Sequence, residues 1–230
     1  FKELNHAIEE LVKKTQLEFT ALKEFTENAS HELQTPLAVI QSNTENLIQH
    51  LKLNEQQSKM LENIGSATNR MSNLTKSLLL LAKIDNNQYE KKAEINIAEI
   101  INNQILFYND LILAKNITLT THIDNNVKVD GNKVLIEILI SNLINNAIKH
   151  NVAKGKIEIS LSHQKLEISN TGNQLITPTS SLFARFKKSS DKNNSIGLGL
   201  AIVKKIIDFF NWSIDYQCTN NNHQITIIFN

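Results

Sequence analysis

Residues 30–37 read SHELQTPL, and they lie inside a stretch whose apolar residues recur every three or four positions. This spacing runs from residue 1 to about residue 84 and is typical of amphipathic helices. A polar break at residues 52–58 (KLNEQQS) divides the stretch into two runs. We therefore expect residues 1–88 to form a helical hairpin. A bend is expected where Pro36 cannot donate a hydrogen bond to the carbonyl of Glu32.

A hairpin of two long helices can bury only part of each apolar stripe. A second copy of the chain would cover the remainder, so residues 1–88 are expected to pair as a homodimer, an all-α dimeric four-helix bundle. The alternative is a monomeric hairpin whose apolar stripe covers the rest of the chain.

After about residue 86 the pattern changes to short alternating runs, which predict strands, separated by longer helical runs. Some strands are joined by hairpins rather than helices, which favours an α+β two-layer sandwich with a mixed sheet over residues 89–230. A polar stretch at residues 85–92 is the expected hinge. The predicted strands are 117–122, 127–129, 156–161, 165–169, 213–217 and 224–229, and the predicted helices are 98–115, 133–150 and 199–211.

The composition excludes several classes of protein. Lys and Arg number 24 against 23 Asp and Glu, a balance that provides no basic surface for nucleic acid. The single cysteine, Cys218, excludes an internal disulfide, and no window reaches the ~18–20 apolar residues of a membrane span. Because the chain begins inside a helical pattern without an initiator Met, we expect a cytoplasmic fragment with no membrane contact of its own. The abundant asparagines are interpreted as composition bias.

His31 is the candidate nucleophile. Its neighbours are polar, so its imidazole is expected to face solvent, and a neutral imidazole nitrogen can attack phosphorus when its tautomer is fixed. Glu32 can accept the hydrogen bond that orients the ring. The segment resembles the H-box of the sensor histidine kinases, with Gln34 where that family usually has Arg. The other histidines of the chain are interpreted as surface residues.

The resemblance covers nearly the whole chain. Residues 142–150 (NLINNAIKH) resemble the family's N-box, and Asn142 and Asn146 share one helix face because they are four residues apart. Amide oxygens can ligate Mg²⁺, and the ammonium of Lys149 can balance phosphate charge. The resemblance implies that Asn146 is the residue on the Mg²⁺ side and that Asn142 and Lys149 lie against the phosphates of ATP.

Residues 170–172 (NTG) resemble the adenine-binding box of the family and include Asn170 and Gly172. Asn170 stands where the family usually has Asp, and Gln174 stands where a second Gly is common. An amide carbonyl can still accept a hydrogen bond from the adenine amino group, although it carries no charge.

Residues 181–186 (SLFARF) resemble the F-box and include Phe183 and Arg185, of which Arg185 is a candidate phosphate contact. Residues from about 177 to 196 are polar and rich in turn-forming residues, which predicts a mobile lid over ATP. The sequence Gly197, Leu198, Gly199 then opens an apolar helix. Glycines there allow backbone N–H groups to approach phosphates at a helix start, where the helix dipole favours anions.

The resemblance therefore implies ATP-dependent autophosphorylation on His31, followed by transfer to the Asp of a separate response regulator. It also implies a parent protein in the bacterial inner membrane. Two alternatives stay open. One is a pseudokinase scaffold that dimerises and docks a regulator, favoured by the changed adenine box, and the other is a phosphatase in which Thr35 orients the attacking water. A gyrase-like ATPase would share the nucleotide fold but would leave the His31 segment unexplained.

The helix that carries His31 is expected to separate two activities. Glu32→Ala should lower autophosphorylation by ~10² to 10⁴, because Glu32 holds the imidazole and takes its proton. Thr35→Ala should leave phosphohistidine formation within about a few-fold of wild type and abolish phosphatase activity. Incorporation of labelled phosphate measures the first activity, and decay of a phosphorylated regulator measures the second. If Thr35→Ala lost both, the division of roles would be wrong.

Overall fold

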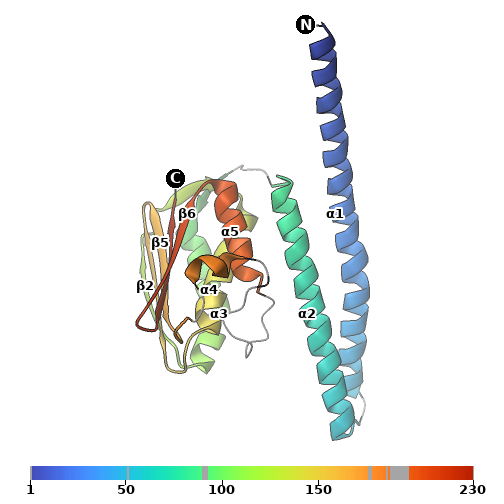
Figure 1. The fold of residues 1–230 in the computed structure, drawn as a ribbon. Helices are drawn as coiled ribbons and strands as arrows, with labels where there is room; N and C mark the ends of the chain where they lie inside the picture. The colour runs from blue at the N-terminus through green and yellow to red at the C-terminus, as the bar shows by residue number, and fades with distance from the viewer. Residues whose placement is uncertain are drawn as a thin grey trace. The chain divides into compact units, whose positions relative to one another are not determined.

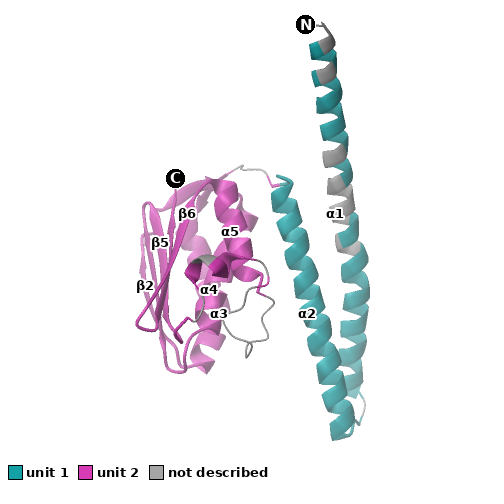
Figure 2. Cartoon of the chain, viewed as in Figure 1, with its two compact units in different colours: residues 1–88 teal, residues 89–230 magenta. Residues whose placement is uncertain are grey.

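A computed structural model of the chain describes residues 2–50, 52–89, 93–175, 178–184, 186 and 197–229. Within these ranges it leaves out the side chains at positions 2, 3, 7, 18, 19, 22–27, 30, 31 and 180. The chain divides into two compact units, Phe1–Gln88 and Tyr89–Asn230, coloured separately in Figure 2. Each unit is described by itself below.

The first unit is a hairpin of two long helices, α1 (Lys2–His50) and α2 (Glu55–Asp85), as Figure 1 shows. A capping box starts α2: the Asn54 side chain accepts from the Gln57 N–H at 2.9 Å, and the Gln57 side chain accepts from the Asn54 N–H at 3.0 Å. The connection is therefore shorter than the predicted break at residues 52–58, because residues 55–58 already form the first helical turn. The α1 helix continues through Pro36, and the bend expected there stays a prediction.

The two helices of the hairpin approach closely around Gly65. A Cβ atom added at Gly65 would lie 3.8 Å from Thr44 Cγ2, and the side chains of Thr44 and Thr68 are both buried. Each threonine hydroxyl donates to the carbonyl four residues earlier in its own helix, so neither is buried without a partner. The hairpin nevertheless leaves a series of large apolar side chains exposed on both helices.

The second unit contains a mixed sheet covered on one face by helices. Its five strands run in the order β2-β4-β5-β7-β6, with β2 and β4 parallel and the other neighbours antiparallel. Strands β1 and β3 form a separate antiparallel pair. The elements are β1 (Ala93–Asn96), α3 (Ile97–Ala114), β2 (Thr118–Ile123), β3 (Lys128–Gly131), α4 (Lys133–Lys149), β4 (Lys156–Ser162), β5 (Lys165–Thr171), the 3₁₀ helix η1 (Thr179–Phe183), α5 (Gly199–Phe210), β6 (Ser213–Thr219) and β7 (Asn222–Ile228).

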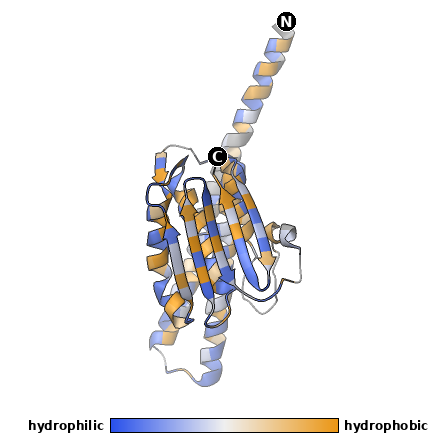
Figure 3. Cartoon of the chain, turned by 90° about the vertical axis from the view of Figure 1, so that its left-hand side faces the viewer, coloured by the Kyte–Doolittle hydropathy of each residue, from blue (hydrophilic) through white to orange (hydrophobic). Residues whose placement is uncertain are grey.

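The core of this unit lies between the sheet and the helices α3, α4 and α5 (Figure 1). Buried residues alternate along the central strands, and Figure 3 shows the corresponding alternation of polar and apolar residues on the sheet. Helix α4 packs against both α3 and α5. Its buried side chains are Leu135, Ile136, Leu139, Ile140, Leu143, Ile144, Ala147 and Ile148.

The predicted fold class, a helical hairpin followed by an α+β sandwich with a mixed sheet, is confirmed. The strand β1 and the 3₁₀ helix η1 were not predicted. Strand β1 has four residues and only Ile95 of them is buried, so it lacks the alternation that identifies a longer strand. It forms because its partner β3, more than 30 positions further along the chain, supplies the backbone hydrogen bonds, pairing Ala93 with Gly131 at one end and Asn96 with Lys128 at the other.

Candidate active site

The candidate site in the second unit begins where β5 ends. Asn170 lies on the inner face of β5, in line with Leu166 and Ile168, and only 6% of it is exposed. Its side-chain amide Nδ2 donates to the carbonyl of Thr171 at 2.8 Å. This bond fixes the orientation of the amide and leaves the Oδ1 atom as the group that can accept a hydrogen bond.

Residues 172–174 follow the end of β5 and are here called the Gly172 loop, which other segments approach closely. The Gly172 N–H donates to the carbonyl of Asn221 at 2.8 Å. A Cβ atom at Gly172 would lie 2.4 Å from His223 Cδ2 and 3.1 Å from the carbonyl oxygen of His150. A Cβ atom would overlap the His223 ring and would press on the His150 carbonyl, so glycine allows the end of β5, the end of α4 and strand β7 to meet here without a shift.

A second set of contacts fixes the start of the same loop. The Thr171 hydroxyl donates to Asn151 Oδ1 at 2.6 Å and accepts from the Lys156 N–H at 2.8 Å. The Asn151 amide Nδ2 in turn donates to the Lys156 carbonyl at 3.0 Å. Asn151 follows directly after the last residues of α4, so this network ties the end of that helix to the Gly172 loop.

The middle of α4 meets the start of α5. Asn142, Asn146 and Lys149 lie on one face of α4 and are half-buried. The Asn142 amide Nδ2 donates to the Ile138 carbonyl at 2.8 Å, and its Oδ1 would be 3.0 Å from a Cβ atom at Gly199. The structure thus brings Asn142 and Gly199 together although 57 residues separate them in the sequence.

The start of α5 exposes backbone donors. Gly197 has a φ of 76°, a conformation that favours glycine, and the Phe186 N–H donates to its carbonyl at 2.9 Å. Leu198 is the N-cap residue and makes no side-chain capping bond, whereas α2, α3 and α4 are each capped by an asparagine. The N-cap side chain therefore does not occupy the first N–H groups of α5, which suits an anion at this end of the helix.

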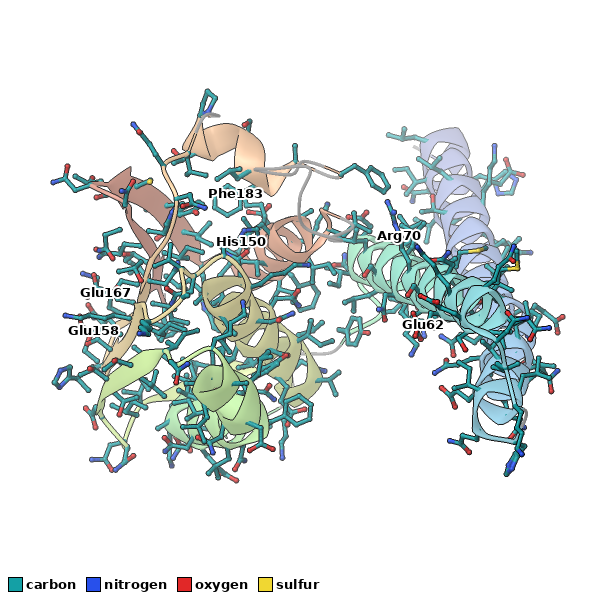
Figure 4. The ribbon with its side chains drawn as sticks, turned by 90° about the horizontal axis from the view of Figure 1, so that it is seen from below. Glu62, Arg70, His150, Glu158, Glu167 and Phe183 are labelled. Carbon is teal, nitrogen blue, oxygen red and sulfur yellow. The ribbon has the colours of Figure 1, made fainter. Side chains whose placement is uncertain are left out.

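Positive charge gathers at the end of α4. The Lys115 ammonium donates to the Ile148 carbonyl at 2.8 Å, and Lys149 lies one residue further along the helix. The pKa of His150 is lowered, first by burial and then by the charges of Lys149, His223 and Lys115. Figure 4 labels His150 at the end of α4 and Phe183 in η1. The Phe183 ring contacts that of Tyr216 edge-on, with the ring centroids 6.4 Å apart.

Some predicted site residues fall outside this description. Arg185 is not among the described residues, and neither is the side chain of His31, which lies in α1. Glu32 and Thr35 are exposed on the same helix. Across the parts of the chain that the structure describes, no group of three or more His, Cys, Asp or Glu residues is placed to hold a metal ion, and no helix is long and apolar enough to cross a membrane.

Sequence reasoning missed one residue of this region. His223 was interpreted as a surface residue, but only 5% of it is exposed, and that interpretation is wrong. Its burial depends on contacts with Tyr216, Gly172 and Asn173, which are remote or uninformative in a local sequence window.

Two family models match the chain. Residues 21–87 match the His Kinase A (phospho-acceptor) domain, and residues 131–229 match the Histidine kinase-, DNA gyrase B-, and HSP90-like ATPase. The Heme sensor protein HssS of Staphylococcus saprophyticus is 33% identical over 210 residues, which are 86% of this chain and 44% of that protein. HssS of Staphylococcus aureus strain Newman is 34% identical over 212 residues, 88% of this chain and 45% of that protein. The chain thus spans less than half the length of these curated relatives.

Solved structures give the same result. The Acinetobacter baumannii histidine kinase AdeS matches with a TM-score of 0.62 and 25% identity, covering 86% of this chain and 96% of that one. Full-length ShkA in complex with AMPPNP matches with a TM-score of 0.68, covering 89% of this chain and 45% of that one, and at 16% identity it supports the fold alone.

The class of protein is therefore one in which a phosphoacceptor hairpin is joined to an ATPase-type sandwich. The chain belongs to the sensor histidine kinases and contains the two domains of their catalytic core.

Gly172→Ala is expected to disrupt the site, because its Cβ atom would overlap the His223 ring and press on a backbone carbonyl. Overpacking of this kind costs about 1–3 kcal/mol. We expect calorimetric titration with ATP to reveal a loss of affinity of roughly tenfold or more. Gly65→Ala is the matched control, because its Cβ atom would meet Thr44 at an ordinary 3.8 Å. Equal ATP affinity in the Gly172→Ala variant and the wild type would contradict the placement of the site.

Proposed function

We propose that the chain binds ATP in its second unit, phosphorylates itself on His31 and passes the phosphoryl group to the Asp of a separate response regulator. The observation that carries this proposal is the convergence of Asn142 on Gly199 at the uncapped start of α5. It occurs in a chain whose other unit matches a phosphoacceptor domain. The membership of the family supports the same reading.

The residues assigned to the proposed site form two groups: a base side, which would contact the adenine of ATP, and a phosphate side, which would contact its phosphates. On the base side, Asn170 Oδ1 would accept from the adenine amino group, because Asn170 Nδ2 is already bonded to Thr171. Gly172 lies beside it, and Phe183 and Arg185 belong to the segment proposed to close over the nucleotide. The neutral amide of Asn170 therefore keeps an oxygen that can accept from adenine, whereas a pseudokinase would be expected to have lost this acceptor. No finding in the structure favours the pseudokinase alternative.

On the phosphate side, the N–H groups around Gly197, Leu198 and Gly199 and the ammonium of Lys149 would bind the phosphates. The Asn146 amide oxygen fits a Mg²⁺ site. This cation commonly takes one or two protein oxygens and completes its shell with water and substrate phosphates, so a cluster of carboxylates is not required. When bound, Mg²⁺ would neutralise charge that develops on the phosphates.

The chemistry assigned to the first unit is a single in-line displacement. An imidazole nitrogen of His31 forms the bond to the γ-phosphorus while the bond to the bridging oxygen breaks and ADP leaves. Glu32 accepts the proton from the other imidazole nitrogen and fixes its tautomer. Because this type of transition state is loose, most of the rate comes from positioning the two reacting groups.

A homodimer through the hairpin follows from the apolar residues that it leaves exposed. On α1, Leu33, Ile40 and Leu47 are exposed at intervals of seven residues, with exposed fractions of 49%, 44% and 41%. On α2, Ile64, Met71 and Leu78 repeat at the same interval, with exposed fractions of 46%, 57% and 39%. Two stripes with heptad spacing are the pattern of a helical bundle seam, which a second hairpin would cover.

The curated relatives are more than twice as long as the segment that matches this chain, so we propose that the chain is part of a longer protein. We propose that the rest of it places the core beneath a bacterial inner membrane and carries the part that senses a signal. Relatives whose name includes "Heme sensor protein" make haem a first candidate for that signal.

Incubation with γ-labelled ATP tests the central claim. The wild type should acquire an acid-labile, alkali-stable label, as expected of phosphohistidine, and His31→Ala should acquire none. His50→Ala is the matched control, because His50 is an exposed histidine at the end of the same helix. Label retained in His31→Ala would place the phosphoacceptor elsewhere.

Multi-angle light scattering tests the homodimer. The wild type should have the mass of two chains at micromolar concentration. Ile40→Glu combined with Ile64→Glu should give the mass of one chain, because buried unpaired carboxylates oppose the proposed seam. Ser42→Glu places the same charge at an exposed polar position of α1 and should stay dimeric. A monomeric wild type would refute the seam.

A further inference from the structure

His223 is a buried histidine that the proposed chemistry does not use. It lies on strand β7 on the same face as Ile225 and Ile227, with 5% of its surface exposed. Its ring packs directly against Gly172, where a Cβ atom would come within 2.5 Å of His223 Nε2. The His223 ring therefore packs against the Gly172 loop on the side of strand β7.

Both nitrogens of the His223 ring are hydrogen-bonded. Nε2 lies 2.9 Å from the carbonyl oxygen of Asn173, which can only accept, so Nε2 donates. Nδ1 lies 3.0 Å from the Tyr216 hydroxyl, and in the neutral ring it accepts from that hydroxyl. The Asn173 carbonyl thus selects the tautomer with its proton on Nε2, and the Tyr216 hydroxyl stabilises that tautomer by donating to Nδ1.

Tyr216 is suited to this task. It is 9% exposed, and burial, followed by the charge of Cys218, raises its pKa to about 12, so the hydroxyl keeps its proton throughout the physiological range. Its ring also contacts Phe183 edge-on, with the ring planes at 72°. A continuous series of contacts therefore runs from η1 through Tyr216 and His223 to the carbonyl of Asn173.

We infer that His223, held in one tautomer by Tyr216, is a positioning residue that sets the conformation of the Gly172 loop for the base of the nucleotide. The inference rests on the proposed function, because it assumes that this loop receives adenine. His223 acts on the base through Asn173 and Gly172. Among the residues that the structure describes, the hydrogen bonds of its ring run to Tyr216 and Asn173.

This role predicts a particular pattern of affinities. Loss of the donor to Asn173 should weaken ATP and ADP by the same factor, because the two ligands share the base and differ only at the γ-phosphate. A histidine that merely fills the core would lower stability without this pattern. Trp212 reports stability separately, because it is the single tryptophan of the chain and packs in the second unit between Phe210 and Phe229.

The test uses calorimetric titration of ATP and ADP with the whole chain. His223→Leu should lower both affinities roughly tenfold, since a buried carbonyl that loses its donor changes an equilibrium constant by about that factor. His223→Gln, which restores a side-chain N–H, should stay within about threefold of wild type. The affinity of Tyr216→Phe for both nucleotides should lie between those of these two variants, because the His223 ring would carry its proton on Nε2 in only part of the population. His122→Leu is the matched control, since His122 is exposed on β2.

Three results would overturn the inference. The first is wild-type affinity for both nucleotides in His223→Leu. The second is a loss that affects ATP but not ADP, which would place the defect on the phosphate side. The third is a loss of nucleotide affinity in His223→Gln as large as that in His223→Leu, when both variants also show the same fall in the urea midpoint of unfolding followed by Trp212 fluorescence. This result would indicate a core defect. A wild type that binds no ATP would instead refute the proposed function, and the inference with it.

Discussion

The absence of a side chain at Gly172 is the constraint on which the proposed nucleotide site depends. Three segments distant in the sequence meet at its α-carbon: the end of β5, the end of α4 and strand β7. Each brings a different group to the meeting point, namely the Asn170 amide, the basic residues around His150 and the His223 ring. A methyl group at position 172 would push these three segments apart. The close approach of the backbone at Gly172 is therefore a precondition for bringing the polar and charged groups of the proposed site together.

The two units bury their apolar residues in different ways. In the second unit α4 is enclosed by the sheet and by its neighbouring helices, so its leucines and isoleucines are almost fully buried within one chain. Each such side chain contributes about 1.5–3 kcal/mol on burial. In the hairpin, by contrast, buried positions such as Leu37 and Thr44 alternate with exposed apolar residues. The second unit also exposes apolar residues, such as Leu106 and Phe107 of α3, but those of the hairpin recur at heptad spacing and present a surface that suits a symmetric partner.

The fold class was predictable because it depends on periodicity. Apolar spacing distinguished the hairpin from the sandwich, and the predicted helices agree with α3, α4 and α5 to within two residues at each end. The short strand β1 and the role of His223 were not predictable. Both depend on partners remote in the chain: β3 for the strand, and Asn173, 50 residues away, for the imidazole. The polar sequence around His223 gives no indication that β7 turns that residue toward the core.

The asparagines, first interpreted as composition bias, have distinct structural tasks. Asn54, Asn96 and Asn132 cap the starts of α2, α3 and α4, and others adopt the left-handed conformation in turns, where asparagine is tolerated better than most residues. The start of α5 breaks this pattern, since Leu198 offers no side-chain acceptor. An asparagine there would occupy an N–H group that the proposed site leaves for a phosphate. Leu198 therefore supports the proposed site in the same way as Asn142 of α4. The apolar N-cap leaves backbone N–H groups for a phosphate, and Asn142 brings a polar side chain to the same end of α5.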